Sequence, residues 1–348
     1  MRAVVIRRHG GIGRLQMAQV PIPSLGLDEA LVEVKACSLN HLDIWTRRGL
    51  PGIAIPMPHV LGCDVAGVLR ALGRPSAGRL AALRRVGQPV VVAPGIACGR
   101  CSACRAGRES LCGEYRILGF QVDGGYAEFV RVPARNLIPI STDRWSYAEW
   151  AAAPLVFLTA WHMLITRGRL QEGEKVLIHA AGSGIGSAAI QIAKWRRAVV
   201  LTTVGGPGKV AKARRLGADH VVNYKKQDFA REVLRITRGR GVDLVFEHIG
   251  PATWAGSLKA LAKGGRLVTC GATSGREVSM DLRPFFAREL SVAGCYMGSR
   301  RELDAVLSWV AKGVFKPVVD TVFPLARTRA AHRRMESRKH FGKLVLAP

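Results

Sequence analysis

The chain has 348 residues, of which 48% are hydrophobic and 22% charged, and 52 Lys and Arg against 25 Asp and Glu give a net charge of +27. This length allows two domains, and the composition is ordinary for a folded protein. Residues Trp150–Thr166 carry no formal charge, but Pro154 and His162 within them favour a buried helix over a membrane span.

The excess positive charge would attract polyanions such as NADPH, coenzyme A esters, RNA or an anionic membrane. However, the basic residues are dispersed along the chain, aromatic residues make up only 6%, and no zinc-finger, homeodomain or RNA-recognition pattern is present. We therefore favour basic side chains on solvated faces, and a nucleic-acid-binding protein remains an alternative from a different class.

The first part of the chain contains short, irregular strand patterns. Residues 1–35 alternate apolar and polar side chains between Gly and Pro, with a clear strand at Ala30–Lys35, and further strands are expected at Val60–Leu69 and Pro89–Ala93. Arg70–Val86, rich in Arg, Ala and Leu, is expected to form a loop and a short helix. Short strands bounded by turn residues predict a small barrel.

Four of the eight cysteines are clustered at Cys98, Cys101, Cys104 and Cys112. This spacing lets a short loop surround one tetrahedral zinc, and four thiolates indicate a structural site. An iron–sulfur cluster and unliganded thiols are the alternatives. The other cysteines are scattered, and Met1–Ile6 already follows a strand pattern rather than a secretory signal, so a reducing cytoplasm is expected.

A strand–turn–helix–strand pattern begins at Lys175. The apolar strand Lys175–His179 is followed by the glycine turn Ala180–Gly186, a helix beginning at Ser187–Lys194 and a second strand at Ala198–Thr203. This order is typical of a βαβ unit that binds a dinucleotide pyrophosphate at a helix N-terminus. The Gly182-x-Gly184-x-Gly186 spacing is tighter than the usual fingerprint, so an ordinary strand–helix turn is the alternative.

Further strands and helices alternate after this unit. Strands are expected at Val221–Tyr224, Val242–Phe246, Arg266–Cys270 and Ser291–Cys295, and helices at Phe229–Thr237 and Thr253–Leu261. Six such strands predict a doubly wound parallel sheet, with the cofactor across the carboxyl ends of the strands. A capping box at Ser146–Glu149 should begin the long helix that leads into this domain, and the strand at Gly342–Leu346 should return to the first domain.

Several of these stretches together carry a family resemblance: Val34–Asp43, Leu61–Gly67, the four-cysteine lobe, Pro154–Trp161, the glycine turn and Leu216–Tyr224. Over nearly the whole chain they resemble the medium-chain dehydrogenase/reductase superfamily. The resemblance implies a GroES-like barrel of residues 1–150 completed by 297–348, a Rossmann NADP-binding domain of residues 151–296, and an active site in the cleft. Members resemble either zinc alcohol dehydrogenases or zinc-free quinone oxidoreductases and enoyl reductases.

The chain departs from the zinc alcohol dehydrogenases at their metal ligands. Those enzymes place a Cys where this chain has Asn40, a His where it has Cys63, and a third Cys near Leu155. They also carry a Glu where it has Asp64. Because Asn and Leu cannot replace thiolates, we expect a structural zinc without a catalytic one. One alternative is an unusual metal site built from Cys37, His41, Cys63 and Asp64. The other is that Cys37 and Cys63 are simply small buried side chains.

These departures favour hydride transfer to a conjugated acceptor, because such a substrate delocalises the charge without a metal. Asn40 is a candidate hydrogen-bond donor to the developing oxyanion. His41 is the nearest candidate proton donor, and a histidine bonded to backbone in the cleft wall is its alternative. Trp45 stands where similar quinone oxidoreductases often carry a Tyr. The candidate catalytic residues are therefore Asn40, His41, Trp45 and Cys63.

The segment Thr202–Lys209 predicts the cofactor. It has no Asp or Glu to bind a ribose 2′-hydroxyl, whereas Lys209 and the Tyr224 of the family's Asn–Tyr pair suit a 2′-phosphate, so NADPH is expected. A solvated lysine at a helix start is the alternative for Lys209. The candidate cofactor-binding residues are Thr159, Gly182, Ser183, Gly184, Ile185, Gly186, Thr203, Lys209, Tyr224, Gly271 and Lys343.

The sequence therefore predicts a cytoplasmic, NADPH-dependent reductase of enones, quinones or enoyl thioesters with one structural zinc. An alcohol dehydrogenase that rebuilds its metal site is the second interpretation. We expect a small-molecule substrate and a homodimer or a dimer of dimers, with the apolar strand Ser291–Cys295 as the candidate edge for pairing.

Overall fold

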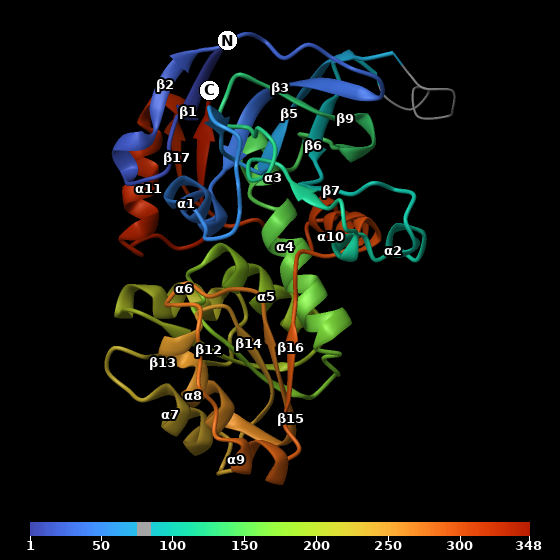
Figure 1. The fold of residues 1–348 in the computed structure, drawn as a ribbon. Helices are drawn as coiled ribbons and strands as arrows, with labels where there is room; N and C mark the ends of the chain where they lie inside the picture. Colours follow the sequence, from blue (N-terminus) through green and yellow to red (C-terminus); the bar gives the residue numbers. More distant parts are fainter. Residues whose placement is uncertain (75–84) are drawn as a thin grey trace. The chain divides into compact units, whose positions relative to one another are not determined.

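The computed structural model describes residues 1–74 and 85–348 (Figure 1). It divides into two compact units, Met1–Leu155 with Ser299–Pro348, and Val156–Gly298. A loop and a short helix were expected at Arg70–Val86. The first residues of this segment instead belong to a strand that ends at Leu72, and 75–84 lie outside the described residues.

The first unit is built around mostly antiparallel strands. Its largest sheet has the order β10-β6-β5-β3-β18-β17, with β9 also paired to β3, and smaller sheets have the orders β2-β1-β4 and β7-β8. The strands are β1 (Arg2–Ile6), β2 (Gln16–Gln19), β3 (Glu29–Ser38), β4 (His59–Val60), β5 (Asp64–Leu72), β6 (Pro89–Val92), β7 (Gly95–Ile96), β8 (Arg116–Ile117), β9 (Phe129–Pro133), β10 (Leu137–Pro139), β17 (Val319–Pro324) and β18 (Lys343–Ala347).

The long strand β3 brings the two ends of this unit together. Ala30, Val32 and Val34 alternate with less buried residues, which places one face of the strand in the core. Ser38 at its carboxyl end pairs with Asp64 of β5, and it also pairs with Val345 of β18. The start of β5 and the C-terminal strand therefore lie on either side of the same residue.

The helices of the first unit are short. They are α1 (His41–Arg48), α2 (Ser102–Arg105), α3 (Tyr147–Ala151), α10 (Arg300–Ala311) and α11 (Thr328–Glu336), with 3-10 turns η1 (Ile12–Arg14), η3 (Glu109–Leu111), η4 (Ala134–Asn136) and η7 (Leu325–Arg327). The capping box at Ser146 is present, since Ser146 Oγ accepts from Glu149 N–H and the Glu149 carboxylate accepts from Ser146 N–H.

The prediction of a single long helix after this capping box is wrong. The chain forms α3, then α4 (Pro154–Trp161) and then the π-helix η5 (His162–Arg167). Proline lacks a backbone N–H and fits the first turn of a helix, so α4 starts anew at Pro154 instead of continuing α3. The boundary between the two units falls within α4. None of the helices in the described ranges is long and apolar enough to cross a bilayer.

The second unit is a six-stranded, wholly parallel sheet in the order β13-β12-β11-β14-β15-β16, which confirms the predicted doubly wound sheet. Its strands are β11 (Lys175–Ile178), β12 (Val199–Val204), β13 (His220–Asn223), β14 (Val242–Glu247), β15 (Leu261–Thr269) and β16 (Ser291–Gly294). Its helices are α5 (Gly184–Trp195), η6 (Pro207–Lys209), α6 (Val210–Arg215), α7 (Phe229–Ile236), α8 (Pro251–Ala260) and α9 (Leu282–Ala287).

One row of apolar side chains crosses this sheet. Leu177 of β11 pairs with Leu201 of β12 and with Val245 of β14, and Val245 pairs with Leu267 of β15. All four are buried in the core together with Val233 of α7. The centre of the sheet is therefore apolar, as expected for parallel strands that helices cover on both faces.

Candidate active site and cofactor-binding edge

A buried lysine lies among the candidate catalytic residues of the first unit. Lys343, the first residue of β18, has a side chain that is 3% exposed. Its Nζ donates to Asn40 Oδ1 at 2.6 Å and to Asp64 Oδ2 at 3.1 Å. Asn40 precedes α1 and Asp64 begins β5, so the pairing of β3 with both β5 and β18 brings these three residues together.

The carboxylate of Asp64 has a partner on each oxygen. Oδ2 also accepts from Asn40 Nδ2 at 2.8 Å and from Ser38 Oγ at 3.3 Å. Oδ1 accepts from the backbone N–H of Leu155 at 2.9 Å. A fully buried carboxylate is tolerated only with such compensation, and the ammonium of Lys343 supplies the balancing charge. We call Asn40, Cys63, Asp64 and Lys343 the lysine cluster.

Cys63 completes the lysine cluster as a neutral thiol. Its Sγ accepts from Asn40 Nδ2 at 3.2 Å. Burial, with the negative charges of Asp64 and Asp43, raises the pKa of the Cys63 thiol well above its ordinary value. Burial likewise raises the pKa of the Cys37 thiol. Both thiols are therefore protonated at neutral pH while no metal is bound.

His41 and Trp45 lie on one side of α1, one turn apart. Their rings meet edge to face, with centroids 5.0 Å apart and an interplanar angle of 74°. Both side chains are half-buried. The structure therefore brings His41 and Trp45 together as a pair on the helix that Asn40 precedes.

A second buried network runs behind this helix. Asp43 accepts from Asn40 N–H at 2.7 Å and from Tyr126 Oη at 3.1 Å. Tyr126 Oη lies 3.4 Å from His332 Nε2, and His332 Nδ1 lies 3.0 Å from Arg47 Nη1. Burial raises the pKa of Asp43 to about 6. The sequence pattern alone had not singled out these four residues as a connected group.

The four cysteines of the expected zinc lobe converge. Their sulfur atoms all lie within 4.8 Å of one another, and within residues 1–74 and 85–348 no other group of three or more His, Cys, Asp or Glu ligand atoms is so placed. The alternative set of Cys37, His41, Cys63 and Asp64 therefore forms no such group in the described part of the chain. The cysteine lobe is therefore a position at which this structure can hold a metal ion.

Backbone N–H groups point at the sulfurs of this lobe. Cys98 Sγ accepts from Cys101 N–H at 3.4 Å and from Arg100 N–H at 3.5 Å, and Cys101 Sγ accepts from Cys104 N–H at 3.5 Å. The hydrogen bonds from Arg100 and Cys101 lower the pKa of the Cys98 thiol to about 6. Four converging sulfurs with amide donors fit one tetrahedral, closed zinc site.

The glycine turn begins the helix α5 as expected. Ser183 is the N-cap, and its Oγ accepts from Gly186 N–H at 2.9 Å. A Cβ on Gly186 would lie 2.3 Å from Ala180 O, so this glycine permits the close approach of helix and turn. The turn residues Gly182, Gly184 and Ile185 complete the N-terminal end of α5, whose free N–H groups suit an anion.

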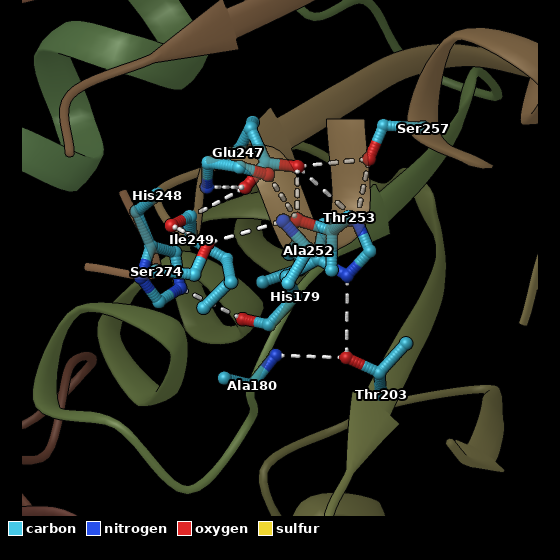
Figure 2. A network of polar contacts seen from close by, with 12 residues as sticks. His179, Ala180, Thr203, Glu247, His248, Ile249, Ala252, Thr253, Ser257 and Ser274 are labelled. Atoms are coloured by element: carbon cyan, nitrogen blue, oxygen red, sulfur yellow. Dashed lines mark hydrogen bonds and ion pairs between the residues drawn. The ribbon is translucent and has the colours of Figure 1, made fainter. Parts of the chain in front are cut away.

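Thr203 lies at the same edge of the sheet but beneath the turn. Its side chain is buried, and its Oγ1 accepts from Ala180 N–H at 2.9 Å. Figure 2 shows this contact beside the imidazole of His179. Thr203 therefore supports the turn and does not present its hydroxyl at the surface.

Tyr224 and Lys209 follow neighbouring strands at this edge. Tyr224 is 44% exposed and directly follows β13, while a Cβ on Gly205, just after β12, would lie 2.6 Å from the Tyr224 hydroxyl oxygen. Lys209 ends η6, the turn that leads into α6. Gly271 follows β15, and a Cβ there would lie 2.9 Å from His248 O.

The chain matches two protein families. Residues 26–142 match the alcohol dehydrogenase GroES-like domain, and residues 184–312 match the zinc-binding dehydrogenases. An alcohol dehydrogenase of Geobacillus stearothermophilus is 31% identical over 95% of this chain and 96% of its own length. This chain belongs to the medium-chain dehydrogenase/reductase superfamily.

Relatives with different reactions match this superfamily member along its length. A crotonyl-CoA reductase of Streptomyces collinus is 30% identical over 96% of the chain and 82% of its own length. A crystal structure of an NAD-dependent alcohol dehydrogenase is 44% identical, covers both chains fully and has a TM-score of 0.94. The chain is therefore an NAD(P)H-dependent oxidoreductase, which confirms the predicted enzyme class, barrel and Rossmann fold.

The dinucleotide of this superfamily fits an unsatisfied group in the second unit. Thr159 of α4 is 5% exposed, and its Oγ1 is buried without a hydrogen-bond partner in the described structure. A buried hydroxyl in this state is costly unless a ligand supplies the partner. The hydroxyl of Thr159 would thus be available to bond a nicotinamide dinucleotide, whose chemistry is hydride transfer.

Glu247 is a residue that the sequence pattern could have identified. It is the last residue of the apolar strand β14, and a carboxylate at the end of a buried strand needs polar partners. Its partners include Ser257, while His179 lies beside both. These residues are not adjacent in sequence, so the strand pattern alone could not group them.

Proposed function

We propose that this chain is an NADPH-dependent reductase that transfers hydride to an activated double bond or a quinone without a catalytic zinc. The observation that carries this proposal is the ammonium of Lys343, which lies within hydrogen-bond distance of both Asn40 and Asp64. A positive charge at this point neutralises the only carboxylate of the lysine cluster and opposes the entry of a divalent cation.

The remaining groups of the lysine cluster support the same conclusion. Asn40 donates both protons of its amide, one to Cys63 and one to Asp64, and Cys63 is a neutral thiol. Asn40 and Leu155 offer no thiolate, so the set of about three protein ligands that a catalytic zinc needs is incomplete. Such an enzyme needs an acceptor that delocalises its own negative charge, as enones, quinones and enoyl thioesters do.

In this proposal the lysine cluster is a rigid, charge-balanced support for α1. His41 at the first position of α1 is the candidate proton donor, and the N-terminal end of that helix favours negative charge nearby. The amide of Asn40 is engaged within the cluster, so its contribution is to position α1. Thr159 would direct its unsatisfied hydroxyl to the cofactor or the substrate.

The preference for NADPH is supported by the edge after β12. Thr202–Lys209 has no acidic residue, and Lys209 and Tyr224 follow neighbouring strands there. NAD is the second candidate, because a crystal structure 44% identical to this chain is described as an NAD-dependent alcohol dehydrogenase. The same relative makes alcohol oxidation the second candidate activity.

One screen separates these candidates. Purified protein would be assayed for oxidation of NADPH and NADH with quinones, enones and enoyl thioesters, and for reduction of NADP and NAD with simple alcohols. Zinc would be counted in the same preparation. We expect one zinc per chain and turnover of conjugated acceptors with NADPH. Two zinc ions per chain, with alcohol oxidation that a chelator abolishes, would overturn the proposal.

We also propose that two chains pair through β16. This strand is the edge of the six-stranded sheet (Figure 1), and its Val292 is 39% exposed. An exposed apolar edge strand is a ready surface for pairing with a second copy. Light scattering should give twice or four times the chain mass of 37.6 kDa, and Val292→Lys, which disrupts the pairing through β16, should halve that value.

The cytoplasm is the compartment that we propose. All eight cysteines are free of disulfide bonds, and four of them converge in the zinc lobe. Thiols in this state persist in a reducing environment. Fractionation of the native cells with an antibody against the chain would test this placement.

A further inference from the structure

A chain of buried side chains connects Glu247 to the glycine turn before α5. Glu247, His179 and Thr203 follow one another across the carboxyl ends of β14, β11 and β12. All three are buried, and Ser257 of α8 lies buried beside them. Figure 2 shows the imidazole of His179 between Thr203 on one side and Ser257 on the other.

The carboxylate of Glu247 fixes the direction of this chain. A carboxylate can only accept, so Ser257 Oγ donates its hydrogen to Glu247 Oε2 at 2.8 Å. Ser257 Oγ must then accept from His179 Nε2, which lies 2.9 Å away, so His179 carries its proton on Nε2. Nδ1 of His179 is left as the acceptor for the hydroxyl of Thr203 at 3.4 Å, and Thr203 Oγ1 itself accepts from Ala180 N–H at 2.9 Å.

Glu247 anchors the far end of the chain. Its Oε1 accepts from Ile249 N–H at 2.6 Å and Gly250 N–H at 3.2 Å, and its Oε2 accepts from Thr253 Oγ1 at 2.8 Å as well as from Ser257. A carboxylate with this many donors stays charged and immobile, so it always accepts the hydroxyl hydrogen of Ser257.

The near end of the chain holds a strained residue. Ala180 has a φ of +53°, a left-handed conformation that a residue with a side chain rarely adopts. Its N–H is held by Thr203, and the preceding carbonyl, His179 O, lies 3.0 Å from His248 Nε2. Its own carbonyl accepts from Ser183 N–H at 2.9 Å and Ser183 Oγ at 2.8 Å. The conformation of Ala180 therefore sets where Ser183, the N-cap of α5, can lie.

We propose that Thr203, His179, Ser257 and Glu247 are positioning residues for the dinucleotide, which keep Ala180 left-handed and the glycine turn in its anion-binding shape. They are buried, so they act through the turn and not by contact with the cofactor. The inference deepens the proposed function, but it needs only a bound nicotinamide dinucleotide and no particular acceptor. Its test can therefore fail or succeed independently of the substrate.

The test is a pair of matched variants. Thr203→Val keeps the shape of the side chain but removes the acceptor for Ala180 N–H. Thr202→Val alters the neighbouring buried threonine, whose hydroxyl donates to Ile178 O at 2.6 Å outside this chain of bonds. Dissociation constants for NADPH and NADH would be measured by fluorescence titration without any acceptor. We expect about a tenfold weaker cofactor affinity for Thr203→Val and wild-type affinity for Thr202→Val.

A rescue experiment distinguishes positioning from general stability. Glycine adopts the left-handed conformation without strain, so adding Ala180→Gly to Thr203→Val should restore most of the lost affinity while the melting temperature stays low. Equal cofactor affinity for Thr203→Val and wild type would overturn the proposal, and so would an unrescued double variant. If Thr203→Val does not fold, nitrogen NMR of the wild-type imidazole decides: His179 protonated on Nε2 supports the chain, and protonation on Nδ1 overturns it.

Discussion

Nζ of Lys343 lies 2.6 Å from Oδ1 of Asn40, although 303 residues separate them along the chain. The same ammonium contacts the buried carboxylate of Asp64. Lys343 and Asp64 therefore form a buried ion pair beside Asn40. The stability and the chemistry of the chain should both depend on that pair.

Lys343→Met should lower the free energy of unfolding by about 3–5 kcal/mol, because it leaves the Asp64 carboxylate buried without a counter-charge. The double variant Lys343→Met with Asp64→Asn removes both charges and should recover part of that loss. Urea unfolding monitored by fluorescence measures both. A double variant less stable than the sum of its single changes would contradict this account of the ion pair.

Asp43 should make stability fall with rising pH. Burial raises its pKa from 3.8 to about 6, so the folded state binds this proton more tightly than the unfolded state does. Its stabilising contribution is complete below about pH 4 and is lost as the pH rises through about 6. The free energy of unfolding of the wild type, minus that of Asp43→Asn, should fall by about 3 kcal/mol across this range.

Only the difference between the two proteins isolates Asp43. Burial lowers the pKa values of His179 to about 4 and of His332 to about 3. These two histidines make stability rise with pH, opposite to Asp43, and they do so in the wild type and in Asp43→Asn alike, so their contribution cancels in the difference. Urea unfolding from about pH 4 to about pH 7 provides the measurement. A difference that is constant or rises with pH would refute the raised pKa.

Cys98→Ser should remove the zinc of the lobe without removing the reaction. We expect the metal content to fall from one zinc per chain to none and the melting temperature to drop by about 5 °C or more, with kcat retained at low temperature. Cys270→Ser, a change at a thiol outside the lobe, is the control and should keep its zinc. Loss of kcat in step with zinc would show that the ion acts in catalysis.

Lys209→Asp should reverse the choice of cofactor. A carboxylate at this position would repel a 2′-phosphate and accept from a ribose 2′-hydroxyl, so the preference for NADPH over NADH should shift by about tenfold or more. Lys212→Asp places the same charge change on the exposed surface of α6 and serves as the control. Equal shifts in kcat/KM for the two variants would mean that the net charge of the protein, and not a contact with Lys209, determines the preference for NADPH.

Thr159→Val should leave the free protein as stable as the wild type, because the hydroxyl it removes has no partner in the described structure. Cofactor or substrate binding should weaken about threefold to tenfold, since the ligand then loses its hydrogen bond. Thermal unfolding without ligand and titration with NADPH give the two readings. A destabilised free protein with unchanged KM values would mean that Thr159 has a structural partner.

Local sequence patterns were sufficient to predict the sheet of the second unit and the clustering of the four cysteines. The strands β11 to β16 are apolar runs separated by turn residues, and parallel strands alternating with helices have few alternative arrangements. Cys98 and Cys112 are close in sequence, so the loop that joins them already limits where their sulfurs can lie. The broken helix at Pro154 was missed because the apolar composition continues across the break, while the proline alone sets the boundary.

The order of the residues was enough to predict the family, the Rossmann sheet and the absence of thiolate ligands at Asn40 and Leu155. The contact of Lys343 with Asp64, and the place of His179 between Thr203 and Ser257, became visible in the folded chain alone. The physical reason is that a side chain's identity limits which bonds it can form, whereas strand pairing decides which partner is near. Residues far apart in the chain become partners only after β18 pairs with β3 and α8 packs beside β14.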